Sequence, residues 1–418
     1  MLIHWIWLAT RPGMNDRQKL EVLKAFQDPE TVFFGDKSAF THIEGMTREA
    51  AEALSDKDLS QVREILNDCI SNEIQICTYH DAAYPAKLRN IADPPMVLYY
   101  KGNLAGLEGN PMIGLVGTRK ASAYGLTTAS RMGYQIARCG GIVVSGVAAG
   151  IDGKAMTGAL TAGGTIVGVL GCGIDVVYPP THRSLYLDTE RNGCLISEFP
   201  PKTPPYKWNF PRRNRIISGM SDGVLVVEAP HGSGSLITAR LALDQGRDVF
   251  VVPGNIDVPT FQGSNALLRD GGIAVSSGWD VVSEYAALYP EKIRKEVGDL
   301  RQYAAREEIS LTENAEKPML KVAQKAAVME KNSLFDRKKV KKPIDNDKKS
   351  AYSDQQKIFE SLSQDEKMLL EPLRKGEALV DELIAASNLP AGKVLSMLTM
   401  LQIRGIIELL PGKRVSLK

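Results

Sequence analysis

The chain has few of the residues that hold disulfides or metal ions, with five cysteines and five histidines among 418 residues. The cysteines are odd in number and form no CxxC pair, and no histidines stand at metal-ligand spacing. Neither a disulfide framework nor a zinc site is therefore indicated. We expect a protein that works in the cytoplasm and uses no metal or other cofactor.

Long apolar runs and an excess of one charge are also missing. No run reaches the roughly 18 apolar residues of a transmembrane helix. The opening MLIHWIWLAT lacks the basic start and the cleavage site of a signal peptide, so we interpret it as a buried helix. The formal net charge of +2 gives no overall attraction to nucleic acid, and any basic site must be local.

The motifs of common nucleotide enzymes and hydrolases are absent as well. GLVGTRKASAYG, where a nicotinamide enzyme keeps its fingerprint, is not GxGxxG, and neither GxxxxGKS nor GxxxxGKT occurs. No serine lies in GxSxG. Asp152, Asp175, Asp222 and Glu228 could act as acid or base, but Asp152 and Asp222 fit helix and turn caps better. These absences favour a protein that is not an enzyme.

One unit repeats between residues 112 and 282, namely a short apolar strand, a turn of small residues, an amphipathic helix and a glycine stop. The strands are expected at 113–116, 142–144, 165–170, 194–197, 224–227 and 249–252. Alternating strands and helices of this length predict an α/β fold with a doubly wound parallel sheet. Residues 74–78 and 96–100 are expected to add edge strands.

The pattern changes on both sides of this region, which predicts four segments in a chain long enough for two or three domains. Residues 1–70 form a small helical domain, in which the turn at Gly45 resembles a helix-hairpin-helix or sterile-alpha-motif turn. That turn could hold a DNA phosphate or could serve helix packing alone. Residues 71–290 form the α/β domain, and residues 291–352 form a charged linker. Residues 353–418 read as a winged helix, which could contact protein or DNA through the helix that carries Lys393 and Arg404.

The turns that follow parallel strands emerge along one edge of the sheet, where ligands bind. Four such turns are rich in glycine, and exposed backbone N–H groups there suit phosphate oxygens. The fourth contains Ser233, Gly234 and Ser235. The segment 206–210 interleaves aromatic residues with Lys207 just before an arginine cluster, which favours single-stranded DNA as the ligand. Within it, Phe210 is expected to stack a base and Trp208 to pack in the core.

Six stretches, in order, closely resemble the DNA-processing protein A (DprA, also called Smf) family: VGTRKASAYG, VSGVAAGID, GCGIDVVYP, FPRRNRIISGMSDGVLVVEA, SGSLITARLA and VFVVPG. The resemblance covers about residues 84–278. It implies an extended Rossmann-like domain that binds single-stranded DNA without cutting it and loads the RecA recombinase during natural transformation. It also implies a homodimer formed through that domain.

The same resemblance assigns DNA contacts to particular positions. The family's phosphate-binding turn and arginine fall on Gly117, Thr118 and Arg119, and its second turn falls on Ser145 and Gly146. Its lysine and its base-stacking phenylalanine fall on Lys207 and Phe210, and the FPRRNR motif carries over as Arg212, Asn214 and Arg215.

An alternative from another class is a nucleotide-processing enzyme of the lysine-decarboxylase-like Rossmann group, which cleaves nucleoside monophosphates. Those enzymes carry a motif resembling PGGxGTxxE. The corresponding turn here, HGSGSLITA, lacks the glutamate that follows.

Overall fold

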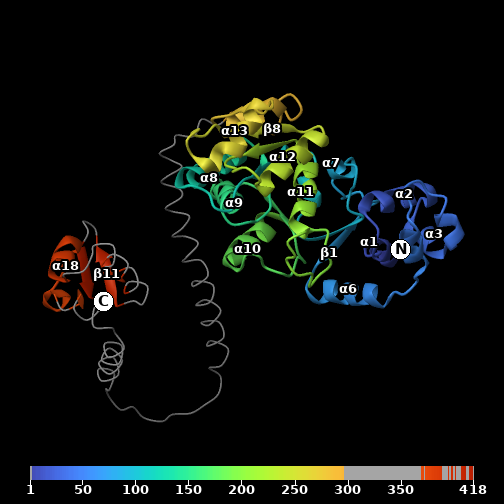
Figure 1. Ribbon diagram of the computed structural model, residues 1–418, viewed down its shortest axis with the longest axis horizontal. Coiled ribbons are helices and arrows are strands. Elements are labelled where there is room, and N and C mark those ends of the chain that lie inside the picture. The colour runs from blue at the N-terminus through green and yellow to red at the C-terminus, as the bar shows by residue number, and fades with distance from the viewer. Residues whose placement is uncertain are drawn as a thin grey trace, which may run out of the picture. The chain divides into compact units, whose positions relative to one another are not determined.

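The computed structural model describes residues 2–295, 369–370, 372–387, 394, 397–398, 401, 406–410 and 414–417 (Figure 1). The chain divides into two compact units, residues 1–324 and 325–418. Of the expected charged linker, residues 296–352 lie outside the described part. The four segment boundaries given above therefore stay predictions.

The first unit begins with six helices, as the helical periodicity of the first 70 residues predicts: α1 (Leu2–Ala9), α2 (Asp16–Phe26), α3 (Pro29–Phe34), α4 (Lys37–Phe40), α5 (Arg48–Ser55) and α6 (Ser60–Ser71). Helix α1 buries Ile6, Trp7 and Leu8 completely, which confirms the buried opening helix. Among the described helices none is long and apolar enough to span a membrane.

The centre of the first unit is a nine-stranded sheet in the order β1-β2-β6-β5-β4-β3-β7-β8-β9. Its strands are β1 (Gln75–Thr78), β2 (Val97–Gly102), β3 (Met112–Val116), β4 (Ile142–Ser145), β5 (Ile166–Leu170), β6 (Gly193–Ser197), β7 (Gly223–Val226), β8 (Asp248–Val251) and β9 (Ile273–Ala274). Strands β3 to β9 pair in parallel, whereas β1 and β2 add to one side in antiparallel pairing. The expected doubly wound sheet and its added strands are confirmed.

Helices cover both faces of this sheet (Figure 1). One core cluster joins Ile113 and Leu115 of β3 to α8 (Ala123–Arg138) and α9 (Ile151–Thr161), and a second joins Val116 of β3 to α11 (Asn209–Met220) and α12 (Gly234–Asp244). Successive side chains of β3 point to opposite faces of the sheet, so the strand contributes to both cores. The remaining helices of the unit are α7 (Ala86–Arg89), α10 (Arg183–Asn192), α13 (Gln262–Arg269) and α14 (Gly278–Val282).

Helices α8 and α9 pack unusually close together because glycines stand where they meet. A Cβ added at Gly133 of α8 would overlap the backbone carbonyl of Ala155, and one added at Gly158 of α9 would overlap that of Ser130. This close approach fixes the position of the first turn of α9, which lies next to the site described below.

The described part of the second unit contains a three-stranded antiparallel sheet in the order β10-β12-β11. Its elements are β10 (Ala378–Leu379), α18 (Val380–Ser387), β11 (Ile407–Leu410) and β12 (Arg414–Leu417). A separate small core contains Leu370, Leu383 and Val394. Lys393 and Arg404 lie outside the described residues.

Candidate nucleic-acid interface

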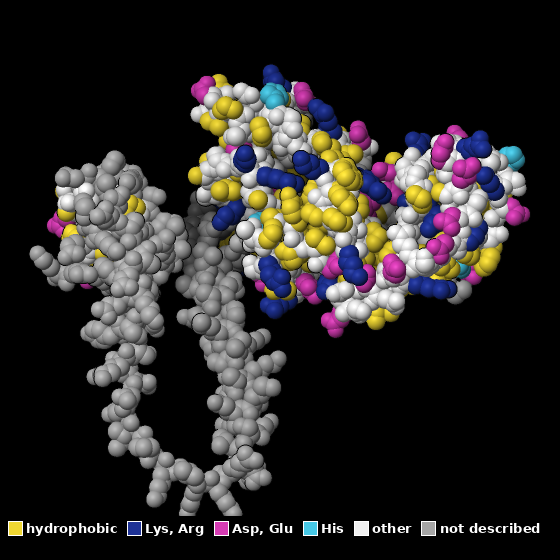
Figure 2. Space-filling view, turned by 60° about the horizontal axis from the view of Figure 1, so that its bottom comes forward, with side chains coloured by type: hydrophobic (Ala, Val, Ile, Leu, Met, Phe, Trp, Pro, Cys, Tyr) yellow, Lys and Arg dark blue, Asp and Glu magenta, His cyan; other side chains and the backbone are white. Residues whose placement is uncertain are grey.

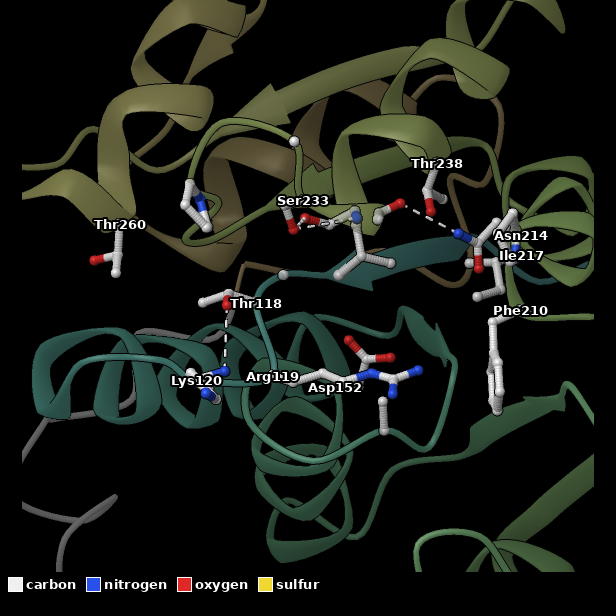
Figure 3. Close-up of a pocket in the computed structure, with 18 of the residues that line it drawn as sticks. Thr118, Arg119, Lys120, Asp152, Phe210, Asn214, Ile217, Ser233, Thr238 and Thr260 are labelled. Carbon is white, nitrogen blue, oxygen red and sulfur yellow. Dashed lines mark hydrogen bonds between the residues drawn. The ribbon is translucent and has the colours of Figure 1, made fainter. Parts of the chain in front are cut away.

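A cavity of about 550 Å³ opens at the carboxyl ends of β3 and β7. Strand β3 has β4 on one side and β7 on the other, so the chain order reverses here, and this is where ligands of doubly wound sheets bind. Many of the predicted contact residues line this cavity: Gly117, Thr118, Arg119, Phe210, Asn214, Ser233, Gly234 and Ser235. Figure 3 shows Thr118, Arg119 and Asp152 on one side, Ser233 and Thr238 on the other, and Phe210 at one end.

The turn after β3 is held by the segment that follows β7 and by α9. The backbone N–H of Thr118 donates to the carbonyl of Glu228 at 2.8 Å, and the hydroxyl of Thr118 accepts from the N–H of Lys120 at 3.2 Å. A Cβ at Gly117 would come within 2.5 Å of the Ile151 side chain. Glycine is therefore required at this position for the turn to lie against α9.

The side chain of Arg119, the last residue of this turn, is exposed. Its guanidinium carbon lies 4.9 Å from the centre of the Phe210 ring. The ring is half-buried between this arginine and the protein, since a Cβ at Gly171 would come within 2.8 Å of it and the Tyr178 ring centre is 5.5 Å away. Among the described residues this guanidinium forms no ion pair, although its charge acts on the buried Asp152 carboxylate. An exposed cation is thus held on an aromatic face, where a ligand can reach it.

The opposite wall is the loop that enters α12. Gly232 has a φ of +73°, and Ser233 caps the helix by accepting from the N–H of Ser235. The amide of Asn214 donates to the carbonyl of Gly234 at 3.2 Å, which joins this loop to α11. Ser233, Gly234 and Ser235 at the N-terminus of α12 thus line the cavity, and the positive end of the helix dipole there favours an anion.

Asp152 and Arg213 form the floor of the cavity. The Asp152 carboxylate accepts from the N–H of Gly146 at 3.1 Å, and Arg213 donates to the carbonyls of Gly146 (2.9 Å) and Val169. Burial raises the pKa of the Asp152 carboxyl, while the charge of Arg213 opposes this. The expectation that Asp152 caps its own helix is wrong in detail, because its carboxylate binds the turn before α9.

Lys120, Arg213 and Asp152 also line the cavity but are missing from the predicted contact set. Lys120 and Arg213 each adjoin a predicted residue in the sequence, and this adjacency is the only feature of the sequence that indicates their place in the cavity. Nothing in the sequence shows that Asp152 points inward.

Two predicted residues of the second turn lie beneath the lining and not in it. Ser145 is fully buried, and its hydroxyl donates to the carbonyl of Leu115 at 2.6 Å. A Cβ at Gly146 would overlap Arg213 and Asp152, so this glycine leaves room for the floor of the cavity.

Arg212 and Arg215 are engaged elsewhere. Both donate to Asp16 of α2, at 2.7 and 2.8 Å, and both pair with Glu198. Arg215 also lies 3.2 Å from Asp93 and is 3% exposed. These ion pairs tie the N-terminal helices to the α/β core, and the DNA contacts predicted for Arg212 and Arg215 stay predictions.

The segment before α11 differs from its prediction. Trp208 is 70% exposed, so its expected place in the core is wrong. Its ring stacks on that of Tyr206, with centroids 4.7 Å apart and an interplanar angle of 8°. Lys207 is exposed and lies outside the cavity lining.

Comparison with known proteins gives consistent matches. A family model described as "DNA recombination-mediator protein A" matches residues 75–286, and one described as "DprA winged helix domain" matches residues 355–413. The DNA processing protein DprA of Bacillus subtilis is 44% identical over 201 residues, which is 48% of this chain and 68% of that protein. Protein Smf of Escherichia coli is 43% identical over 200 residues, and the aligned part is 53% of its length.

A solved structure is also similar. The X-ray structure of DNA processing protein A from Streptococcus pneumoniae superimposes with a TM-score of 0.61 and 32% identity. The match covers 68% of this chain and 98% of that one.

Proposed function

Because this chain belongs to the DNA recombination-mediator protein A family, also called DprA or Smf, we propose that it binds single-stranded DNA without cutting it. In this proposal it protects incoming DNA and loads the RecA recombinase in natural transformation or recombination. It works in the cytoplasm as a homodimer formed through the Rossmann-like domain.

The observation that carries the proposal is the pairing of Arg119 with Phe210 at the mouth of the cavity. A single strand offers phosphates that need positive charge and unstacked bases that need flat surfaces. Arg119 supplies the charge, and Phe210 supplies an aromatic face that a base can occupy when the guanidinium turns from the ring to a phosphate. The positive N-terminal end of α12 adds to the attraction for an anion on the opposite wall.

The hydrogen bonds inside the cavity support a binding role over hydrolysis. The hydroxyls of Ser233 and Ser235 lie 2.8 Å apart and bond to each other. Among the described residues, neither hydroxyl is bonded to His231, so neither is activated by that base. The fully buried carboxylate of Glu228 accepts from the N–H and hydroxyl of Ser122 and thereby holds the start of α8.

Asp152 is the observation that keeps the nucleotide-processing alternative open. It is a buried carboxyl with a raised pKa in a cavity large enough for a mononucleotide, and such groups act as general acids. In that case Asp152 would protonate the departing base of a nucleoside monophosphate.

The test is a filter-binding titration with single-stranded and duplex oligonucleotides at several salt concentrations. We expect preferential single-strand binding that weakens with salt, with no nuclease, ATPase or phosphoribohydrolase turnover. Turnover that survives purification and disappears in Asp152→Asn would establish the enzyme. Absence of single-strand binding at low salt would refute the proposal.

A further inference from the structure

A second cavity, of about 440 Å³, adjoins the first one on the far side of Arg119. It lies between the turn after β3, the start of α9 and the start of α10, and its polar lining includes Arg119, Lys120, Lys154, Thr157, His182 and Ser184. Arg119 and Lys120 line both cavities. A chain-like ligand could therefore pass from one cavity to the other along these two side chains.

The lining of this second cavity is basic and contains no carboxylate among the described residues. Lys154 and Lys120 are both exposed, and neither takes part in an ion pair within the described part of the chain. Other lysines of the unit are neutralised, since Lys87 pairs with Asp222 at 2.7 Å and Lys202 pairs with Asp68 at 2.5 Å. Cations gathered on one wall without counter-charges create a local potential that favours an anion.

His182 is fixed in this wall. Its Nδ1 donates to the carbonyl of Val147 at 3.0 Å, and a Cβ at Gly153 would come within 2.6 Å of its ring. The Nε2 atom is the ring nitrogen that remains for a ligand. Lys154, one residue beyond Gly153, lies in the first turns of α9, whose N-terminus adds to the positive potential.

We propose that this second cavity binds backbone phosphates of the same single strand that occupies the first. A base stacks at Phe210, the adjoining phosphate meets Arg119, and the next part of the backbone continues to Lys120 and Lys154. Figure 2 shows Lys and Arg side chains around a hydrophobic area on one face of the first unit. This inference rests on the proposed function and adds a residue, Lys154, that the family motifs above do not assign.

The test measures the affinity of the unaltered full-length protein and of its Lys154→Ala variant for two oligothymidylates over a range of salt concentrations. One oligothymidylate has about three nucleotides and the other about twelve. Alanine suits a helix, so the variant should fold. The matched control is Lys292→Ala, which also removes one exposed lysine but lies outside both cavities. On the long oligonucleotide the log–log salt slope of Lys154→Ala should fall by about 0.7, the value for one phosphate contact on a single strand.

Over a tenfold rise in salt, affinity of the unaltered protein for the long oligonucleotide should thus drop about fivefold more than that of Lys154→Ala. The short oligonucleotide fills only the first cavity and should bind both proteins equally. A Lys154→Ala that matches Lys292→Ala on the long oligonucleotide would overturn the second cavity while leaving the proposed function intact. Equal losses of affinity on both oligonucleotides would assign Lys154 to the first cavity, and this result would also overturn the proposal for the second cavity. If the unaltered protein binds neither, the proposed function itself fails.

Discussion

Arg119 and Phe210 cannot be treated as independent contacts. The sequence predicts a phosphate contact for one and a stacked base for the other, yet the guanidinium lies on the ring. Removing the ring also removes the surface that orients the cation. Removing the cation exposes a ring face that it now covers.

The first prediction is therefore a coupling between these two residues. Arg119→Ala should weaken binding to all sequences and lower the single-strand salt slope by about 0.7. Phe210→Ala should cost about 1 to 3 kcal/mol of binding free energy, mainly on single strands. The double variant should lose less than the sum, with a coupling of about 0.5 to 1 kcal/mol, because each single change already breaks the cation–π contact.

Titrations of the four proteins with single-stranded DNA at several salt concentrations measure this coupling. Phe210→Tyr keeps the ring and should retain both affinity and slope. Strictly additive losses would mean that the contact is incidental. A fall in melting temperature that accompanies equal losses on single and duplex DNA would show instead that Phe210 only supports the fold.

The ion pairs around Asp16 show where sequence reasoning fails. The arginine cluster was recognisable, but Arg212 and Arg215 meet a carboxylate almost 200 positions away, on a different helix. Local sequence gives no sign of such a partner. Because Arg213 of the same helix faces the cavity while Arg215 faces α2, neighbouring arginines with similar appearance have opposite roles.

This cluster leads to a pH-dependent prediction. Burial opposes ionisation of Asp16, but Lys19 and Arg215 outweigh it and hold the pKa of the carboxyl below its ordinary value. A lowered folded-state pKa stabilises the protein above the unfolded pKa of about 3.9, and this stabilisation is lost as pH falls through the folded value. Asp16→Asn should therefore cost about 3 kcal/mol of unfolding free energy near pH 7, and the cost should shrink below about pH 4.

Denaturant unfolding of both proteins across this pH range checks the sign. Asp257→Asn, an exposed change in a loop, serves as the control and should have little effect at any pH. A cost that stays constant down to the lowest pH would contradict the ion-pair explanation.

The contact between α8 and α9 predicts that a glycine-to-alanine change within a helix lowers stability, which is opposite to the effect expected from helix propensity. Alanine is a better helix former than glycine by about 1 kcal/mol. Gly133→Ala should nevertheless destabilise the protein by about 1 to 3 kcal/mol, because the added methyl group overlaps the backbone of α9. Since α9 carries Asp152 and Lys154, DNA affinity should fall as well.

Thr127→Ala in the same helix is the matched control, because this position is exposed and alanine there should be neutral or slightly stabilising. Thermal melting and single-strand titration of both variants provide the comparison. If Gly133→Ala melted at or above the temperature of the unaltered protein, the close approach of the two helices would be refuted.

The fold could be predicted from the sequence more completely than the positions of the side chains in the candidate site. Parallel strands buried on both faces read as continuous apolar runs, so β3 to β8 and their order of appearance follow directly from the pattern. The turns after those strands then had to share one edge. Side-chain direction does not follow in the same way, since Trp208 points outward and Asp152 inward without a local signal.

For the molecule as a whole, a net charge of +2 gives no overall attraction to DNA, so we expect binding to depend on the local cavities of the first unit. The second unit has its own core and sheet. We therefore expect single-strand binding to be retained by a protein cut after residue 324, where the two units divide. Its affinity should be within about tenfold, or 1.4 kcal/mol, of that of the whole chain.

The position of the cut matters for this last prediction. A protein ending at Pro290 would lose Ile293, which is 7% exposed in the main core, and the N–H of Arg294, which donates to the carbonyl of Cys139 at 3.2 Å. It should therefore melt earlier than the protein cut after residue 324, and melting curves of the two separate a folding defect from lost contacts. If the longer protein melts normally but binds single strands more than tenfold less tightly than the whole chain, residues beyond 324 contribute directly to DNA binding. That result would move part of the interface into the second unit, residues 325–418, and would support the DNA-contacting alternative for the winged helix.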